Sequence, residues 1–233
     1  MNRLPDIIAH RGAPREVLEN TLEGFEIALN QGADGIELDV HATRDGVVVV
    51  HHDPVLRLNG DPIAAPVAIA DLDATEALAL PLRDNARMPM LDAVLDLVGT
   101  RATVYVEVKA TAIEDALVAC LARHPDARVA VHAFDHRIPV AVRQRRPGLP
   151  IGLLSASYPL SVEGFIASAR PDAFWQQAQL IDQALVDACH AQGMRVIAWT
   201  ENDHVHAQSL IAMGVDALCT DTPGLLRKRL LEG

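Results

Sequence analysis

Three carboxylates in the first half of the chain each stand two residues from another charged side chain. Glu37 and Asp39 are two apart in one apolar run, and Glu107 and Lys109 repeat that spacing in another. Side chains at i and i+2 share one face of a strand, so each pair projects together. Three carboxylates packed together repel one another unless a cation lies between them. Oxygen-only ligands favour one divalent cation, Mg²⁺ or Ca²⁺, rather than zinc.

Two histidines and two cationic side chains accompany these carboxylates. The first apolar run ends in His10-Arg11-Gly12, and His52 follows a run of valines. Histidine suits general acid–base catalysis, which contributes roughly 10²–10⁴-fold in rate. Arg11 and Lys109 carry positive charge suited to phosphate oxygens. The set indicates metal-assisted chemistry on a phosphate group.

A purely structural interpretation stays open for some of these side chains. The acidic pair could be satisfied by an ion pair with Lys109, because buried charges also pair for structural reasons. We expect His51 to be a solvated neighbour of His52. The remaining histidines have no comparable partners in sequence, and for most of them we expect a surface or core position: His41, His124, His132, His136, His190, His204 and His206.

The elements that must position these residues follow a repeated order of helix, closing glycine and strand. Gly32, Gly193 and Gly214 each stand between a helical stretch and an apolar run, where glycine ends a helix at little cost. Barrel strands are expected at about 6–10, 35–40, 103–109, 128–132, 150–154, 172–175, 194–199 and 216–219. Helices are expected at about 21–31, 91–99, 112–124, 135–145, 161–168, 181–191, 203–213 and 223–231. Eight such units favour a closed TIM (β/α)₈ barrel over an open α/β sheet.

The valine run at 47–50 does not fit the barrel pattern. The turn residues Thr43–Gly46 lie between it and the strand at about 35–40, and this connection is too short for a parallel crossover, which needs a dozen or more residues. The run is therefore predicted to be an antiparallel hairpin excursion after the second strand. This pairing places His52 close to Asp39, at the C-terminal ends of the strands, where barrel enzymes keep their sites.

Length and composition are consistent with one domain of this kind. The chain has 233 residues, of which 50% are hydrophobic and only 3% aromatic, so its core must be built mainly from aliphatic residues. Such a composition is typical of parallel strands buried on both faces. The irregular stretch at about 54–90 is too short for an independent domain. We expect a single domain over 1–233, with this stretch as a small cap insertion over the barrel mouth. Asn20 is the expected cap of the first helix.

Charge and hydropathy narrow the classes of partner. The formal net charge of −11 argues against binding of a nucleic-acid backbone, and an anionic substrate must be drawn in by local cations. The absence of an apolar run of membrane-spanning length argues against stable membrane association. The N-terminal residues lack the pattern of a signal peptide, so we expect a cytoplasmic protein. The sequence gives no indication of oligomeric state.

These motifs resemble the glycerophosphodiester phosphodiesterase family, in its compact bacterial form. The resemblance is carried by His10-Arg11-Gly12, Glu19-Asn20-Thr21, Gly32–Val40, Thr43–Gly46, His52-Asp53, Glu107-Val108-Lys109, Trp199–Asn202, Gly214-Val215-Asp216 and Thr220–Pro223. It spans nearly the whole chain and is most specific in the first half. The segment at about 110–190 contributes little to it.

The resemblance implies a TIM-barrel phosphoric diester hydrolase that cleaves a small-molecule glycerophosphodiester to glycerol 3-phosphate and an alcohol. By position, His10 and His52 match the family's general acid–base pair. Glu37, Asp39 and Glu107 match its ligands for one divalent cation. The nucleophile implied is the glycerol 2-hydroxyl, through a cyclic phosphate, or else water directly.

The resemblance also implies a set of substrate contacts. Arg11 and Lys109 match the phosphate contacts, Trp199 the aromatic side chain near the glycerol pocket, and Glu19 an acidic residue that lines the site. These assignments place every substrate contact on the same rim as the proposed metal ligands.

The chain departs from the family pattern at three places. Leu18 stands where the family has proline, the segment after Asp53 is short, and His132-Ala133 precedes Phe134 where the family has a small serine. None of these changes touches the expected metal or acid–base positions, so they bear on substrate choice.

Two other functions remain as alternatives. One is a related lipid phosphodiesterase of the phospholipase D or phosphatidylinositol lyase kind, which would need an apolar or membrane-binding surface. The other is a non-catalytic binding module that keeps the barrel.

Overall fold

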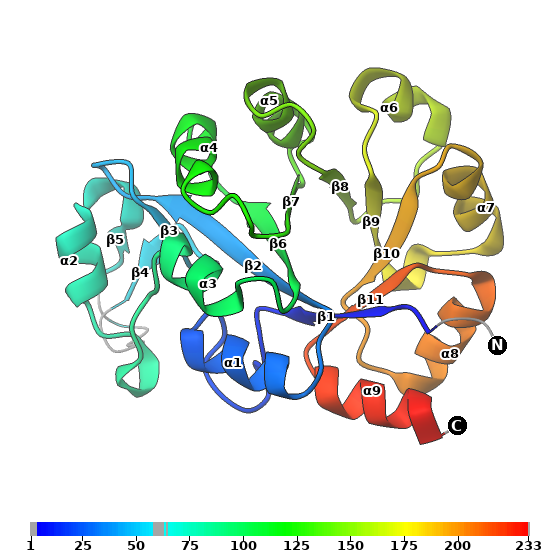
Figure 1. Ribbon diagram of the computed structural model, residues 1–233, viewed down its shortest axis with the longest axis horizontal. Helices are drawn as coiled ribbons and strands as arrows, with labels where there is room; N and C mark the ends of the chain where they lie inside the picture. The colour runs from blue at the N-terminus through cyan, green and yellow to red at the C-terminus, as the bar shows by residue number, and fades with distance from the viewer. Residues whose placement is uncertain (1–3, 58–62, 64, 233) are drawn as a thin grey trace.

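Eight parallel strands close into a barrel within the part of the chain that the computed structural model describes, residues 4–57, 63 and 65–232 (Figure 1). The barrel strands are β1 (Asp6–His10), β2 (Gly35–Ala42), β6 (Thr103–Val108), β7 (Val129–Ala133), β8 (Ile151–Ser155), β9 (Ala173–Gln177), β10 (Arg195–Trp199) and β11 (Ala217–Thr220). Each lies within two residues of its predicted range. The predicted TIM barrel is confirmed.

The barrel closes because β1 pairs with both the second and the last barrel strand. Asp6 lies beside Ala217 of β11, and His10 lies beside Glu37 of β2. The order of the strands around the sheet otherwise follows the sequence, which is what right-handed βαβ connections produce. All eight strands therefore end at the same rim.

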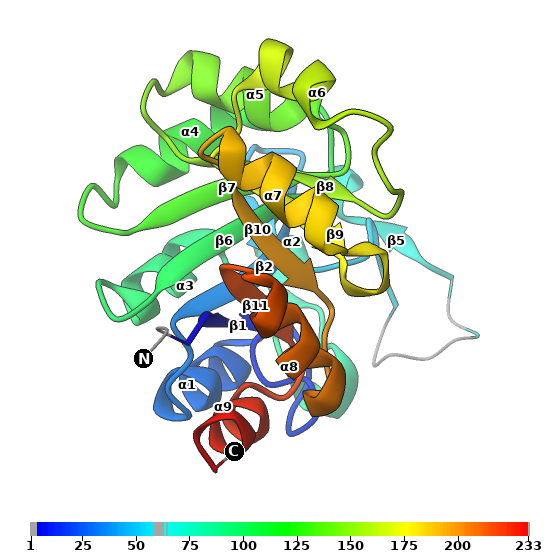
Figure 2. The ribbon, with the colours of Figure 1, turned by 90° about the vertical axis from the view of Figure 1, so that its right-hand side faces the viewer.

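The helices form a layer outside the strands (Figure 2). They are α1 (Leu22–Asn30), α3 (Leu91–Val98), α4 (Glu114–Ala122), α5 (Arg137–Arg145), α6 (Val162–Ala169), α7 (Gln183–Ala191), α8 (His204–Met213) and α9 (Pro223–Glu232), with short 3₁₀ turns at Ile69–Asp71, Arg83–Asn85 and Ala178–Leu180. Buried aliphatic side chains fill the space between the two layers. No helix in the described part of the chain is long and apolar enough to cross a bilayer.

Helix α1 begins with a different cap from the one expected. The Thr21 hydroxyl accepts a hydrogen bond from the Gly24 amide at 3.2 Å, which is the role predicted for Asn20. Asn20 instead has a φ of 57° and is 1% exposed. Asparagine tolerates this left-handed conformation better than most residues. The expectation for Asn20 was wrong, because its side chain turns inward toward Asp39.

The predicted hairpin is confirmed. Strand β3 (Val48–Val50) runs antiparallel to β2, with Val50 beside Val40. Beyond the paired residues, the His51 amide donates to the Asp39 carbonyl at 3.0 Å. This contact continues the ladder and holds the start of the 51–53 segment at the end of β2.

The stretch at 54–90 is more regular than its composition indicates. It contains β4 (Val55–Leu56) and β5 (Val67–Ala68), which pair with each other, and α2 (Ala74–Ala79). The Asp73 amide donates to the Glu76 carboxylate at 2.8 Å, so the capping signal was present in the sequence. A small core of Leu56, Ile69, Ala77, Leu82 and Met88 packs these pieces against Val49 of β3.

Candidate active site

A cavity of about 150 Å³ lies at the C-terminal ends of the strands and collects most of the predicted site residues. It is lined by His10, Arg11, Glu37, His52, Glu107, Lys109, His132, Phe134, Leu154, Trp175, Trp199 and Cys219. Asp39 and Glu19 are the two predicted residues that lie outside this lining. Both are joined to it through Arg11, as described below.

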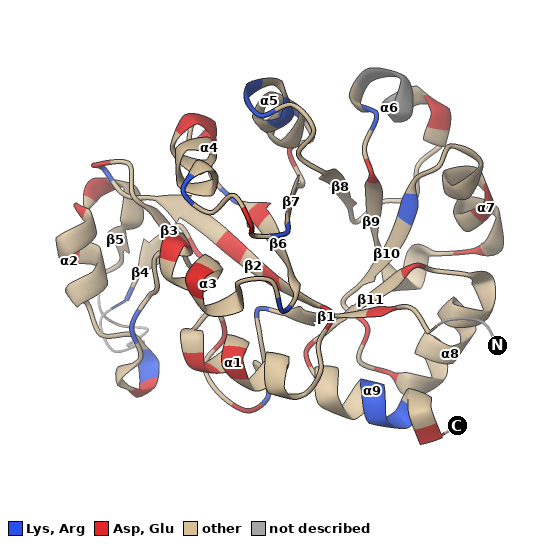
Figure 3. Cartoon of the chain, viewed as in Figure 1, with Lys and Arg blue, Asp and Glu red and all other residues tan. Residues whose placement is uncertain are grey.

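Strand register explains why the acidic residues meet. Glu37 lies beside His10 on one neighbouring strand, and Asp39 lies beside Glu107 on the other. Acidic positions on β2 and β6 consequently fall inside the ring of outer helices (Figure 3). The residues of the two predicted pairs share one rim because neighbouring parallel strands end together.

Asp39 is fully buried and surrounded by donors. One carboxylate oxygen, Oδ2, lies 3.1 Å from Arg11 Nε and accepts from the Asn20 amide at 2.9 Å. The other, Oδ1, lies 3.5 Å from Lys109 Nζ and has no hydrogen-bond partner among the described residues. Burial raises the pKa of Asp39, but the charges of Arg11 and Lys109 outweigh it and lower the pKa overall. Asp39 is therefore a buried carboxylate with one oxygen to spare.

Glu37 and Glu107 experience the opposite balance. Burial raises the pKa of both groups, and the charge of Asp39 raises it further. Glu107 has Lys109 as partner at 2.9 Å, so the structural ion pair considered from sequence is present. Arg11 and Lys109 together bring two positive charges to three buried carboxylates, so one negative charge remains uncompensated. The donor set fits a divalent cation, which would relieve this repulsion.

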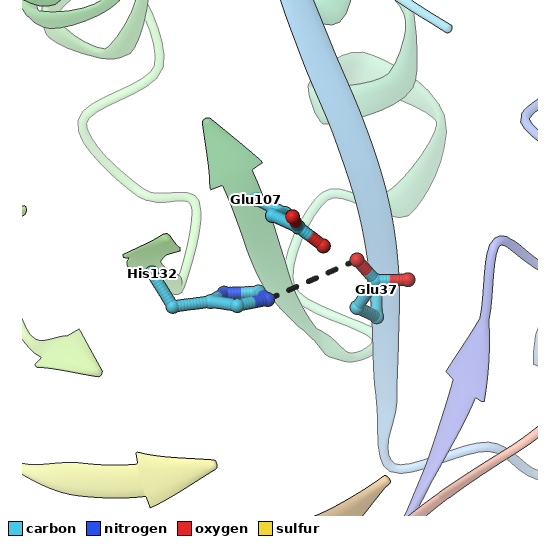
Figure 4. A group of neighbouring side chains, drawn as sticks. All are labelled: Glu37, Glu107 and His132. Atoms are coloured by element: carbon cyan, nitrogen blue, oxygen red, sulfur yellow. Dashed lines mark ion pairs between the residues drawn. The ribbon is translucent and has the colours of Figure 1, made fainter. Parts of the chain in front are cut away.

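His132 completes this cluster and was not anticipated from the sequence. It projects from β7 toward Glu37 and Glu107, and one ligand atom from each residue lies within 4.8 Å of the others (Figure 4). Burial lowers the pKa of His132 to about 3, so the imidazole is neutral at pH 7. Sequence analysis had placed His132 among the histidines without comparable partners.

His10 is held by a residue that sequence analysis did not single out. Its Nδ1 lies 2.7 Å from Asp221 Oδ1. The other Asp221 oxygen accepts from Asn202 at 2.9 Å and pairs with Arg15 at 3.4 Å. Burial raises the pKa of Asp221, but the hydrogen bond and charge of His10, with Asn202, lower it overall. Thr220–Pro223 belonged to the quoted motifs, so the signal was available.

His52 approaches the cavity from the hairpin. Its Nδ1 lies 2.8 Å from Asp53 Oδ1, and its carbonyl lies 3.1 Å from Nε2 of the buried His41. His51 lines a separate cavity and is partly buried, although we had expected it to be solvated. His41 thus has a structural role in fixing the backbone of the acid–base candidate.

Arg11 links the two predicted residues that lie outside the cavity lining. Its guanidinium contacts Asp39 and also donates to Glu19 at 2.9 Å. The turn that aims it depends on Gly12, whose φ is 91° and where a Cβ atom would come within 2.8 Å of the Gly24 backbone. Glu19 consequently acts on the site through Arg11.

Two aromatic side chains form one wall of the cavity. Trp199 and Phe134 meet edge to face, with ring centroids 5.4 Å apart. Phe134 is 46% exposed, which is unusual for a side chain of its size and places an apolar surface at the entrance. A wall of this kind suits the C–H faces of a small polyol.

Comparison with known proteins agrees with this geometry. The model of the glycerophosphoryl diester phosphodiesterase family matches residues 10–225. The chain belongs to this family. It is 30% identical, over 97% of its length and 98% of the relative's, to a glycerophosphodiester phosphodiesterase of Caldanaerobacter subterraneus subsp. tengcongensis. It is a phosphoric diester hydrolase, and its substrate class is the glycerophosphodiesters.

Solved glycerophosphodiester phosphodiesterases share the whole fold. The structure from Thermotoga maritima superposes with a TM-score of 0.83 at 26% identity, covering 98% of this chain and 99% of that one. A phosphodiesterase of Oleispira antarctica, solved in complex with the product sn-glycerol-3-phosphate, superposes with a TM-score of 0.87 at 23% identity and 97% coverage of both chains. The family likeness therefore extends beyond the motifs quoted from sequence.

A cavity larger than the candidate active site lies elsewhere in the described part of the chain. It measures about 640 Å³ and opens at the N-terminal ends of the strands, beside Thr103, Arg128 and Arg195. None of the predicted site residues lines it. TIM-barrel enzymes perform their chemistry at the C-terminal rim, so the smaller cavity is the candidate active site.

Proposed function

We propose that the enzyme hydrolyses glycerophosphodiesters to glycerol 3-phosphate and an alcohol, with a divalent cation at the rim and with His10 and His52 as general acid and base. One observation carries this proposal. The two histidines line the same cavity as Glu37, Glu107 and Lys109. The product seen with the Oleispira antarctica neighbour belongs to that protein and supports the choice of product here.

The proposed ligands of the cation are Glu37, Asp39 and Glu107, and the proposed ion is Mg²⁺ or Ca²⁺. Buried carboxylates with raised pKa values at Glu37 and Glu107 support this set, as does the spare oxygen of Asp39. When bound, the cation would neutralise charge on the phosphoryl oxygens of the transition state.

Each of the two histidines has one ring nitrogen available to exchange a proton with the substrate. In each, Nδ1 is engaged by an aspartate, at 2.7 Å for His10 and 2.8 Å for His52. Nε2 is thereby left as the nitrogen available to the substrate. One histidine would take a proton from the nucleophile, and the other would protonate the leaving alkoxide.

Arg11 and Lys109 would hold the phosphate, and Trp199 would cover the glycerol. Both cations line the cavity and are already oriented by carboxylates, so little ordering remains to be done on binding. Glu19 would fix the direction of the Arg11 guanidinium.

The cap and the barrel are proposed to act as one domain over 1–233. The segment at 54–90 shares its small core with β3, and it lines a cavity of about 410 Å³ beside Glu19 and Asp53. We propose that the enzyme works on dissolved substrates in the cytoplasm; its three cysteines, all buried as free thiols, fit a reducing compartment.

Removal of the metal tests the reaction. Enzyme that has been stripped with EDTA should lose turnover of glycerophosphocholine, and Mg²⁺ or Ca²⁺ should restore it. Glu37→Gln should abolish the restoration or raise the metal concentration required, while circular dichroism shows an intact fold. Full activity in a thoroughly chelated sample would remove the metal from the proposal.

A substrate panel tests the product and the nucleophile. Choline, ethanolamine, glycerol and inositol diesters should all release glycerol 3-phosphate if the site reads the glycerol side. A diester in which propane-1,3-diol replaces glycerol lacks the 2-hydroxyl. Its stability to the enzyme would indicate the cyclic-phosphate route, and its hydrolysis would indicate direct attack by water.

A further inference from the structure

His132 occupies an unusual place for a histidine without an assigned role. It lies on β7, directly beside Glu107 of β6 and Gly152 of β8, and it is 1% exposed. It therefore stands at the same level of the barrel as one of the carboxylates of the proposed metal site. Its imidazole lines the same cavity as His10 and His52, which come from β1 and the hairpin.

The ring is held rigidly by Trp175 on β9. The two rings stack with centroids 4.2 Å apart and planes 3° from parallel. A Cβ atom at position 152 would lie 2.7 Å from the Trp175 indole, so this stack requires glycine there. Both rings border the active-site cavity and also the larger cavity at the other end. The stacked pair thus forms the floor of the active site.

The polar atoms of His132 are poorly satisfied by the protein. Nδ1 is buried and has no hydrogen-bond partner among the described residues. Nε2 lies 3.8 Å from Glu37 Oε1, which is too long for a hydrogen bond. Burial of an imidazole nitrogen without a hydrogen-bond partner carries a desolvation cost. Such a cost is expected to be retained only where the nitrogen serves another purpose.

The spacing fits coordination better than it fits hydrogen bonding. One ligand atom from each of Glu37, Glu107 and His132 lies within 4.8 Å of the other two. Metal–ligand bonds of about 2.0–2.6 Å place ligand atoms within this range of one another. The three side chains point toward one common point from adjacent strands (Figure 4).

We propose that His132 supplies a nitrogen ligand to the cation held by Glu37 and Glu107, and thereby gives this Mg²⁺ or Ca²⁺ site additional affinity for Mn²⁺, Co²⁺ and Zn²⁺. The inference rests on the proposed metal site. Imidazole suits first-row transition metals, whereas Ca²⁺ takes oxygen ligands almost exclusively. The rigid stack on Trp175 also limits expansion of the site to the larger coordination shell that Ca²⁺ prefers.

The test measures binding of the metals alone, without turnover. Apo enzyme is titrated with Zn²⁺, Co²⁺ and Ca²⁺ by calorimetry, and Co²⁺ loading is followed by its visible absorption. His132→Phe keeps a ring to stack on Trp175 and removes both nitrogens. We expect this variant to lose at least about tenfold in affinity for Zn²⁺ and Co²⁺, to change little toward Ca²⁺, and to shift the Co²⁺ spectrum.

Controls separate this proposal from the metal site itself. His190→Phe removes a histidine that pairs with Asp216 on the outside of the barrel and should bind all ions normally. Glu37→Gln should weaken every ion. Equal losses for all ions in His132→Phe, or no loss for Zn²⁺ and Co²⁺, would overturn the role of His132 and leave the metal site standing. Failure of wild-type enzyme to bind any divalent ion would overturn both.

A direct observation covers the case in which His132→Phe does not fold. In wild-type enzyme labelled with ¹⁵N-histidine, Zn²⁺ should move a ring-nitrogen resonance strongly. That resonance is assigned to His132 by its absence from His132→Asn or by its ring contact with Trp175. An unchanged His132 resonance at saturating Zn²⁺ would refute coordination.

Discussion

The two acid–base candidates reach the same cavity from regions of different rigidity. His10 ends a barrel strand, and its aspartate, Asp221, is 18% exposed and held by further partners. His52 follows a hairpin, and its aspartate, Asp53, is 66% exposed and pairs with His52. The attraction between the two charges of an ion pair is stronger in a buried, fixed setting than in water. At the barrel rim, His10 is therefore held by a half-buried aspartate with further partners, whereas on the hairpin His52 is held by a largely exposed one.

The largest effect should come from removing either histidine. His10→Ala and His52→Ala should each lower kcat by at least about 10²-fold, or about 3 kcal/mol of barrier, because general acid–base transfer is the task proposed for them. The melting temperature should change little, since neither side chain contributes much packing. Steady-state kinetics and thermal unfolding measure the two effects.

The same pair should give the wild-type enzyme a bell-shaped pH–rate profile. One histidine must be neutral and the other charged, and the limbs belong to the coupled pair rather than to either residue. If both alanine variants kept ordinary rates, acid–base catalysis by this pair would have to be abandoned. If only one of the two variants kept an ordinary rate, the other histidine would be the single proton carrier of the pair.

An intermediate effect is expected from Asp221→Asn. Without the carboxylate, a positive charge on the imidazole is less stabilised, so one limb of the profile should move by about one unit to lower pH, with a loss of about tenfold in rate at its optimum. A merely structural role for Asp221 would lower stability without moving the limb. The complete pH–rate profile distinguishes the two roles.

Asp221→Asn should also change the pH dependence of stability. The depressed pKa of Asp221 means that its ionised form stabilises the fold above the ordinary aspartate value, and that this contribution is lost as pH falls through the folded pKa. The variant should therefore be less stable than wild type at neutral pH and converge with it in acid. Urea unfolding at several pH values measures the difference, and a constant gap down to the lowest pH would contradict the linkage.

A smaller effect is expected from Asp53→Asn, the matched change on the hairpin. Because Asp53 is largely exposed, solvent screens its charge, and its removal should alter kcat by less than about 1 kcal/mol of barrier. An effect as large as that of Asp221→Asn would show that the hairpin closes over Asp53 when substrate binds. In that case Asp53 would support His52 as firmly as Asp221 supports His10.

The smallest effect should be that of His51→Ala. The His51 side chain lines the cavity beside the cap rather than the active-site cavity, and its hydrogen bond to β2 is made by the backbone. We expect kcat to stay within about 0.5 kcal/mol of barrier. An inactive His51→Ala beside an active His52→Ala would exchange the roles of the two residues.

The barrel could be predicted from sequence because local signals repeat eight times. Helical stretches, three of them closed by glycine, alternate with aliphatic runs, and the short connection before Val47 leaves only a hairpin as the outcome. The i, i+2 spacing at Glu37 and Asp39, and at Glu107 and Lys109, likewise gives the direction of the side chains without further information. The cap at 54–90 was less accessible, because its short strands pair only with each other.

Other parts of the site depend on neighbours that are distant in sequence. Asn20 could have capped a helix, but the turn after Arg11 carries it to Asp39, so Thr21 takes the capping position. Asp221 meets His10 only because the last strand of the barrel pairs with the first. Neither contact has a sequence spacing from which it could be read.

His132 is the clearest case of a residue whose partners depend on the tertiary structure and could not be predicted from the sequence. Its residue type and its place in an aliphatic strand are equally compatible with a core histidine or with a ligand. Register sets it beside Glu107, Gly152 leaves room for the Trp175 ring, and the stack then turns its imidazole toward Glu37. Each of these steps joins residues from different strands. The sequence determines the chemistry of each side chain, but the closure of the barrel determines which other residues it contacts.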